Sequence, residues 1–214
     1  AGALGGIEAD HANGLPAFTI IGLPDAARGE AKDRVRSAAS NSGCDLPNRK
    51  VTVNLSPASL PKHGSGFDLG IAVAALATTG VVTAEALDGV VHLGELSLDG
   101  RLRPVAGVLP AVLAARRAGA RAVVVLSGNA VEAGLVGGIR IVGAASLRDV
   151  LIHHGAELEP VPVEPLVGAT AEEPPGEEGD LSDVVGHPEA VEALQVAAAG
   201  GHHLMMLGPP GAGK

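Results

Sequence analysis

Aromatic residues are nearly absent from this chain of 214 residues. It has no tryptophan and no tyrosine, and Phe18 and Phe67 are its two phenylalanines. A core must therefore be built from Ala, Val, Leu and Ile, and a hydrophobic content of 46% is sufficient for one. The same scarcity argues against binding of single-stranded nucleic acid by base stacking, which needs aromatic platforms.

Cysteine is also scarce, since Cys44 is the one example. No internal disulfide can form, and we expect a cytoplasmic protein. No apolar stretch of about 18 residues occurs, so we expect neither a membrane span nor a membrane partner, and no signal peptide is visible. The chain begins at Ala1 rather than at methionine, so we expect that residues are missing from that end.

Basic residues are missing from one long segment, residues 155–180. The segment holds eight carboxylates and no Lys or Arg, and thus contributes −8 to a total net charge of −9. It also contains five prolines, which predicts an extended, self-repelling linker. The rest of the chain is close to neutral, so the overall acidity does not exclude an anionic partner elsewhere.

The hydrophobic pattern before this linker predicts interleaved strands and helices in a domain of residues 1–154. Strands are predicted at 4–9, 16–22, 51–55, 122–126 and 139–142, and a hairpin joins 90–98 to 101–105 through Asp99-Gly100. Helices are predicted at 25–42, 67–79, 108–118, 129–136 and 146–154, the last capped by Ser146. Without a strict βαβ alternation, the fold class is α+β or mixed α/β.

A regular hydrophobic pattern is found again after the linker, in residues 181–214. A helix is predicted at 189–199 and a short buried strand at 202–207. The last residues form the phosphate-binding pattern G-x-x-x-x-G-K: Gly208, Pro209, Pro210, Gly211, Ala212, Gly213 and Lys214. Glycines let backbone N–H groups surround a phosphate, and the lysine adds a charge, so the pattern predicts binding of ATP with Mg²⁺ in an intact protein.

Four further stretches carry a family resemblance: residues 14–26, 51–58, 62–72 and 93–105. Together with the phosphate-binding pattern they resemble the ComM/YifB group of magnesium-chelatase-like AAA+ ATPases. The resemblance implies a front domain with the Lon-protease fold (ribosomal S5 domain 2-like), a linker at 155–180, and an AAA+ module starting near 181. It also implies a hexameric ring that uses ATP for branch migration of DNA in natural transformation or recombination.

The likeness to Lon raises the question of proteolysis, because Lon-type proteases use a serine activated by a lysine. In the resemblance these positions fall on Gly66 and Leu109, which have neither a nucleophile nor a base. Ser65 is one residue away and Lys62 lies in a different block. A literal S-x-x-K spans Ser59 to Lys62, but the intervening proline disfavours the shared helical turn that such a pair needs. We therefore expect no catalytic residues and no Ser-Lys protease activity.

A basic stripe is predicted on the helix at 25–42, where Arg28, Lys32 and Arg36 recur at every fourth residue. It belongs to a wider group of seven basic residues: Arg28, Lys32, Arg34, Arg36, Arg49, Lys50 and Lys62. The functional interpretation is contact with phosphates of branched or single-stranded DNA; the alternative is an ordinary solvated helix face.

Two other residue types have a structural interpretation. Asp68 is predicted to complement the dipole at the start of its helix. The adjacent histidine pairs, 153–154 and 202–203, lack the spacing of a metal site, so no metal is expected.

Three functions remain in view. The favoured one is a DNA-remodelling ATPase. The first alternative is a motor subunit of magnesium chelatase, which a Lon-like front domain argues against. The second is a non-enzymatic interaction or oligomerisation module. Since the sequence lacks the acidic motif, the sensors and the arginine finger that hydrolysis needs, the 214 residues alone are expected not to hydrolyse ATP.

Overall fold

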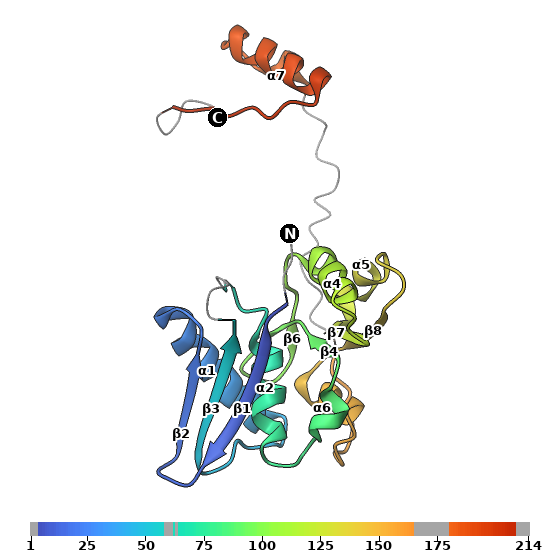
Figure 1. Cartoon of the computed structure of the whole chain (residues 1–214). Coiled ribbons are helices and arrows are strands. Elements are labelled where there is room, and N and C mark those ends of the chain that lie inside the picture. The colour runs from blue at the N-terminus through green and yellow to red at the C-terminus, as the bar shows by residue number, and fades with distance from the viewer. Residues whose placement is uncertain (1–3, 58–61, 63, 165–179, 209–214) are drawn as a thin grey trace. The chain divides into compact units, whose positions relative to one another are not determined.

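The computed structural model describes residues 4–57, 62, 64–164 and 180–208. The chain divides into two compact units, residues 1–168 and 169–214. The front unit is a mixed α/β domain with three small sheets (Figure 1). The predicted fold class is therefore confirmed at this level.

The first sheet has the order β1-β3-β2. Its strands are β1 (Gly6–Ala12), β2 (Ala17–Ile21) and β3 (Lys50–Ser56). The central strand β3 is antiparallel to β1 and parallel to β2, so the Asn13-Gly14 turn joins two strands that do not pair with each other. Apolar side chains alternate along β3, and Val51, Val53 and Leu55 are all buried.

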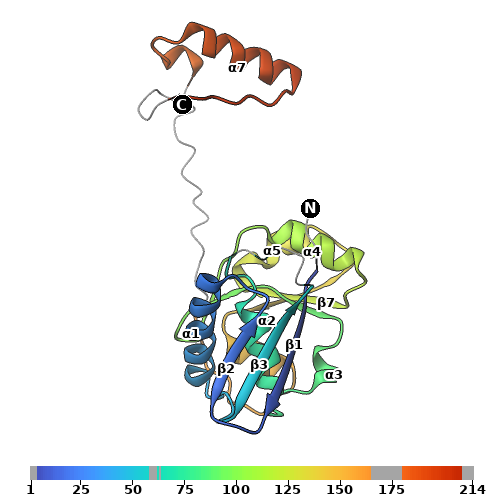
Figure 2. The ribbon, with the colours of Figure 1, turned by 60° about the vertical axis from the view of Figure 1, so that its left-hand side comes forward.

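Two helices pack against this sheet. They are α1 (Asp25–Asn41), which connects β2 to the parallel strand β3, and α2 (Asp68–Ala77). Figure 2 shows α1 alongside β2 and α2 behind the sheet. Because α2 is apolar on nearly all sides, it is buried along most of its length and forms the centre of the front unit.

The second sheet is wholly parallel and has the order β4-β7-β8. Its strands are β4 (Val90–His92), β7 (Ala122–Leu126) and β8 (Arg140–Ala144). The central strand β7 is buried at every position, as expected for a parallel strand covered on both faces. Val124 and Leu126 join the main core around α2, whereas Val123 and Val125 belong to a separate apolar cluster.

Three helices complete this half of the domain. They are α4 (Val108–Arg117), α5 (Ala130–Gly134) and α6 (Leu147–His153). The predicted cap of α6 is confirmed, because Ser146 accepts the amide hydrogen of Asp149 while Asp149 accepts that of Ser146. A 3-10 turn, η1 (Ser127–Asn129), precedes α5, and a short helix that we did not predict, α3 (Ala84–Leu87), is capped by Thr83.

The hairpin predicted from residue 90 to residue 105 is wrong in its first strand. The run breaks at Leu93-Gly94 into β4 and β5 (Glu95–Leu96), and only β5 pairs with β6 (Leu102–Arg103). Leu93 donates its amide to Val124, and Gly94 donates to Gly66, so the chain leaves one sheet and enters another. A Cβ on Gly94 would lie 2.7 Å from the Leu102 side chain, which explains why a glycine occupies the crossing.

In the second unit the structure describes η2 (Leu181–Asp183) and α7 (Pro188–Gly200). The predicted helix is confirmed, but the predicted strand at 202–207 is wrong, because residues 202–208 form no strand. A strand needs a hydrogen-bonded neighbour, and the described part of this unit offers none. Of the phosphate-binding pattern only Gly208 is described; residues 209–214 lie outside the described residues.

No helix in the described parts of the chain is long and apolar enough to cross a membrane.

Two glycines test the backbone geometry of the front unit. Gly22 has φ +94° and a Cβ there would lie 2.4 Å from the Leu55 carbonyl oxygen, whereas a Cβ on Gly29, inside α1, meets nothing within 4 Å. We expect Gly22→Ala to lower the free energy of unfolding by about 2–3 kcal/mol through strain and overlap. Gly29→Ala should raise it by about 0.5–1 kcal/mol through helix propensity.

Urea denaturation of both variants checks this pair of opposite effects. Equal stability of the two variants would contradict the geometry at Gly22.

Candidate functional site

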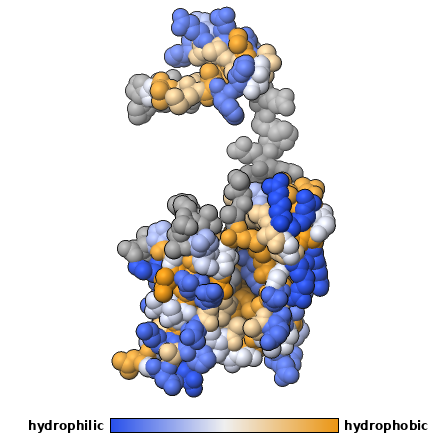
Figure 3. All heavy atoms as spheres, in the orientation of Figure 1, coloured by the Kyte–Doolittle hydropathy of each residue, from blue (hydrophilic) through white to orange (hydrophobic). Residues whose placement is uncertain are grey.

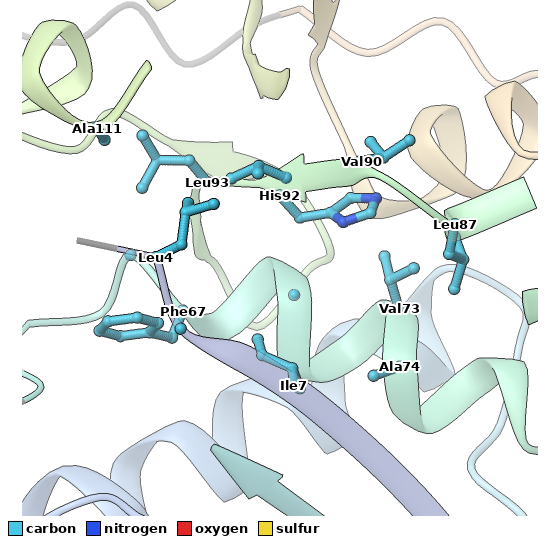
Figure 4. Close-up of a pocket in the computed structure, with 14 residues that line it drawn as sticks. Leu4, Ile7, Phe67, Val73, Ala74, Leu87, Val90, His92, Leu93 and Ala111 are labelled. Carbon is cyan, nitrogen blue, oxygen red and sulfur yellow. The ribbon is translucent and has the colours of Figure 1, made fainter. Parts of the chain in front are cut away.

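An apolar cavity of about 300 Å³ lies between the two larger sheets of the front unit. It is bounded by the start of β1, the start of α2, strand β4 and the first turn of α4 (Figure 4). The larger side chains that line it are Leu4, Ile7, Phe67, Val73, Leu87 and Leu93. Figure 3 shows apolar surface on this face, between the polar rims of the domain.

The cavity contains Gly66, the residue that we expected at the nucleophile position of a Lon-type protease. Gly66 lines it directly, and Ala111, two residues after Leu109, lines it from α4. The start of α2 and the first turn of α4 therefore meet at one cavity, although Leu109 itself is not among the described residues that line it. Gly66 offers no side chain, and the Leu109 side chain, 39% exposed, offers no proton acceptor.

The serine and lysine nearest these positions are held by other partners. Ser65 donates a hydrogen bond to the carboxylate of Glu95, which also lies 3.8 Å from the guanidinium of Arg103. The Lys62 side chain is 3% exposed, and its Nζ donates to the Pro57 carbonyl oxygen at 2.6 Å. Ser59 of the literal S-x-x-K pattern lies outside the described residues.

Asp68 begins α2 directly behind the cavity and is 1% exposed. Its carboxylate accepts two hydrogen bonds from Arg34 of α1, at 2.6 Å and 3.2 Å, and one from the Leu96 amide at 3.4 Å. Burial raises the pKa of Asp68, and the Arg34 guanidinium opposes that rise. The predicted role at the helix start is thus joined by a second one, a bidentate ion pair that links α1 to α2.

His92 is the one titratable side chain among the residues that line the cavity. Its Nε2 lies 2.8 Å from Nε2 of His154, the C-cap of α6, so one ring donates and the other accepts. Burial lowers the pKa of His92 to about 3 and also lowers that of His154, with the neighbouring histidines adding to the effect. Both rings are therefore neutral at pH 7.

Among the described residues, no group of three or more His, Cys, Asp or Glu side chains is arranged to hold a metal ion.

The basic stripe lies on the outer face of α1. Arg28 and Arg36 are exposed and Lys32 is half-buried. The exposed acids Glu30 and Asp33 lie on the same helix. Two members of the wider basic group turn inward instead: Arg34 binds Asp68, and Lys62 is buried.

Sequence patterns did not reveal two pairs at this site. Arg34 and Asp68 are 34 residues apart, and His92 and His154 are 62 residues apart, so no periodicity connects them. The available signal was chemical: an acid inside the apolar run 67–79 needs a partner when it is buried.

Comparison with known proteins agrees with this arrangement. Residues 7–129 match the family described as subunit ChlI of Mg-chelatase, and residues 180–214 match a second family described as magnesium chelatase, subunit ChlI. The first match includes both sides of the cavity. The front unit therefore defines a domain of the magnesium-chelatase ChlI type.

The relatives identify a particular family within the magnesium-chelatase class. An uncharacterized protein of Mycobacterium tuberculosis is 49% identical over 210 residues, and competence protein ComM of Haemophilus influenzae is 43% identical over 210 residues, in each case 97% of this chain. The chain belongs to the ComM/YifB family of magnesium-chelatase-like proteins. It spans 41% of the length of these two relatives.

A more distant match concerns the front unit. Lon protease of Mycolicibacterium smegmatis is 32% identical over 121 residues, which is 53% of this chain and 15% of that protein. The front domain is thus related to Lon.

Removal of Arg34 tests the ion pair. We expect Arg34→Met to lower the free energy of unfolding by about 2–3 kcal/mol at neutral pH, because it leaves a buried carboxylate without its partner. Without Arg34, the pKa of Asp68 in the folded protein rises further. As the pH falls, the folded variant therefore binds a proton before the unfolded chain does. The loss of unfolding free energy is therefore complete above the pKa of Asp68 in the folded variant, and it becomes smaller as the pH falls below that pKa.

Chemical denaturation at several pH values measures this effect. Arg36→Met, an exposed arginine two residues along α1, is the matched control and should change little. A deficit that stays constant from neutral to acid pH would rule out the proposed origin.

His92 predicts a second pH effect. Its pKa of about 3 lies below the ordinary value of 6.5, so the unfolded chain binds the additional proton between these values. The stabilising contribution is complete above pH 6.5 and is lost as the pH falls towards 3. We expect His92→Gln to remove a slope of about 1.4 kcal/mol per pH unit from that interval.

Unfolding free energies of wild type and variant over this interval measure the slope. His11→Gln, on exposed β1, is the control and should retain it. Identical slopes in wild type and His92→Gln would refute the assignment.

Proposed function

We propose that this chain is the front part of a longer, ATP-driven ring motor that remodels branched DNA, as in natural transformation or recombination. The observation that carries the proposal is the 43% identity to competence protein ComM over 97% of the chain. The terminal residues Gly208, Pro209, Pro210, Gly211, Ala212, Gly213 and Lys214 fall inside the matched segment 180–214.

In this proposal ATP and Mg²⁺ bind to the longer protein. The glycine-rich segment holds the phosphates and Lys214 supplies the charge. Six copies form the ring, and the 214 residues alone neither form it nor hydrolyse ATP. Since the lone Cys44 suits a reducing compartment, the activity belongs to the cytoplasm.

The front domain takes the ribosomal S5 domain 2-like fold of Lon without its peptidase chemistry. Support comes from Gly66, which lines the cavity at the proposed nucleophile position, and from Leu109 at the proposed lysine position. The neighbouring Ser65 and Lys62 have other partners. The exposed Arg28, the half-buried Lys32 and the exposed Arg36 are the proposed contacts to DNA phosphates.

One observation favours a second candidate, an interaction module. The cavity is apolar and lies beside β1, an edge strand of its sheet. An extended segment of a partner protein could pair with β1 and place an apolar side chain in the cavity. The other alternative is the magnesium-chelatase motor subunit. The names of the matched families favour this alternative. Competence protein ComM, which matches over 97% of this chain, does not favour it.

The test uses the full-length protein. We expect branched DNA to stimulate its ATPase activity, and Lys214→Ala to abolish that activity with and without DNA. The triple variant Arg28→Glu, Lys32→Glu, Arg36→Glu should keep the basal ATPase but weaken DNA binding. For duplex arms, the slope of log K against log salt should fall in magnitude by about 2–3, one phosphate contact per residue lost.

Arg117→Glu, an exposed reversal on α4, serves as control and should bind DNA as the wild type does. ATPase activity that survives Lys214→Ala would defeat the ATP-binding assignment. Unchanged DNA affinity in the triple variant would defeat the stripe and favour the interaction module.

A further inference from the structure

A second hollow, of about 410 Å³, lies at the amino ends of the three parallel strands. There Val90 of β4, Ala122 of β7 and Arg140 of β8 are neighbours in register, and Arg121 directly precedes β7. The end of α6 completes the wall with His153 and His154. β4, β7, β8 and α6 can be followed together in Figure 1.

The charge of this hollow is of one sign. Among the described residues that line it, the titratable side chains are Arg121, Arg140, His153 and His154, and none is a carboxylate. The remaining lining residues are small or apolar. In a chain with a net charge of −9, such a concentration of cationic and proton-binding groups is not explained by composition.

The hydrogen bonds and ion pairs of the described residues engage few of the N–H donors of the two arginines. Arg121 uses one nitrogen to donate to the Ala86 carbonyl oxygen at 3.2 Å. Arg140 is exposed and forms no ion pair within the described part of the chain. A guanidinium has five N–H donors in a planar fork, so most of the donor capacity of the pair is unused.

The histidines form the less polar side of the hollow. His154 is 8% exposed and contacts both the ring of His153 and Nε2 of His92. Arg121 lies close enough to His154 to lower its pKa, after burial and His153. The ring of His154 is therefore neutral at pH 7, and the positive charge of the hollow comes from Arg121 and Arg140.

Three carbonyl groups in the last turns of α6 are already hydrogen-bonded. Those of Val150, Leu151 and Ile152 accept hydrogen bonds from backbone N–H groups of the residues that follow the helix. Because a helix ends with partial negative charge, an anion here must be held by the arginine side chains.

We propose that this hollow is a binding site for one phosphate group, held by Arg121 and Arg140 with His153 at its rim. Two guanidinium forks, one directly before β7 and one at the start of β8, match the oxygens of a phosphate, and the volume suits a small phosphate ester. The residues of the site belong neither to the α1 stripe nor to the terminal glycine-rich segment. It does not depend on the proposed DNA-remodelling activity.

The experiment titrates the 214-residue chain with inorganic phosphate, with AMP and with a short single-stranded oligodeoxynucleotide at low salt. Amide chemical shifts and calorimetry report the binding. We expect saturable shifts at Arg121, Arg140 and His153. Arg121→Ala and Arg140→Ala should each weaken binding about tenfold, and the double variant should abolish it.

Two controls make the result specific. Arg117→Ala removes the same charge from α4 outside the hollow and should bind as the wild type does. Lys214→Ala excludes the terminal segment and should also leave the shifts unchanged. Tighter binding of AMP than of phosphate identifies a nucleotide as the source of the group, and tighter binding of the oligonucleotide identifies a nucleic-acid backbone.

The proposal is overturned if none of the three probes gives saturable shifts at these residues. It is overturned equally if binding persists in the double variant. Since both arginines are at the surface, thermal denaturation of the double variant should show a folded domain, which separates lost binding from lost structure.

Discussion

The buried carboxylate of Asp68 is the constraint around which the front domain is arranged. A charge with 1% exposure must be paired and hydrogen-bonded, and its two partners come from two other elements. Arg34 reaches it from α1, the Leu96 amide reaches it from β5, and Asp68 itself begins α2. Satisfying this one group therefore fixes how α1, α2 and the short β5–β6 sheet meet. It also fixes the start of α2, and with it Gly66 and Phe67, which form one wall of the apolar cavity.

Strand β7 has the corresponding role in the other half of the domain. Because it is buried on both faces, it separates the main core from the cluster under α4 and α5. Its partner β4 carries His92 and leads into Leu93, so the same sheet supplies the second wall of the cavity. At its amino end the sheet aligns Arg140 with Ala122, next to Arg121, and this alignment creates the basic hollow. One parallel sheet thus supports an apolar site and a cationic site.

Local pattern predicted much of this fold because many of its elements carry their own signals. Ser146 with Asp149 three residues later is a capping box, and the helix follows as expected. The apolar run after Phe67 is too long for a strand, and it forms α2. The prediction of a hairpin from residue 90 was wrong for a non-local reason. The amides of Leu93 and Gly94 donate hydrogen bonds to the carbonyl groups of Val124 and Gly66, respectively. The prediction of a strand at 202–207 was wrong because an apolar sequence does not by itself supply a hydrogen-bonded neighbouring strand.

The candidate sites divide in the same way. The sequence by itself determined the family and the phosphate-binding pattern at 208–214, because these depend on residue identity at given positions. The expectation that Gly66 and Leu109 replace the side chains of a protease rests on residue identity in the same way. Only the tertiary structure decided that Arg34, a member of the wider basic group, binds Asp68, and that His92 contacts His154. It alone brought Arg121, Arg140 and His153 to one hollow. The physical reason is that burial and strand register act between residues far apart in the chain, where no periodicity connects them.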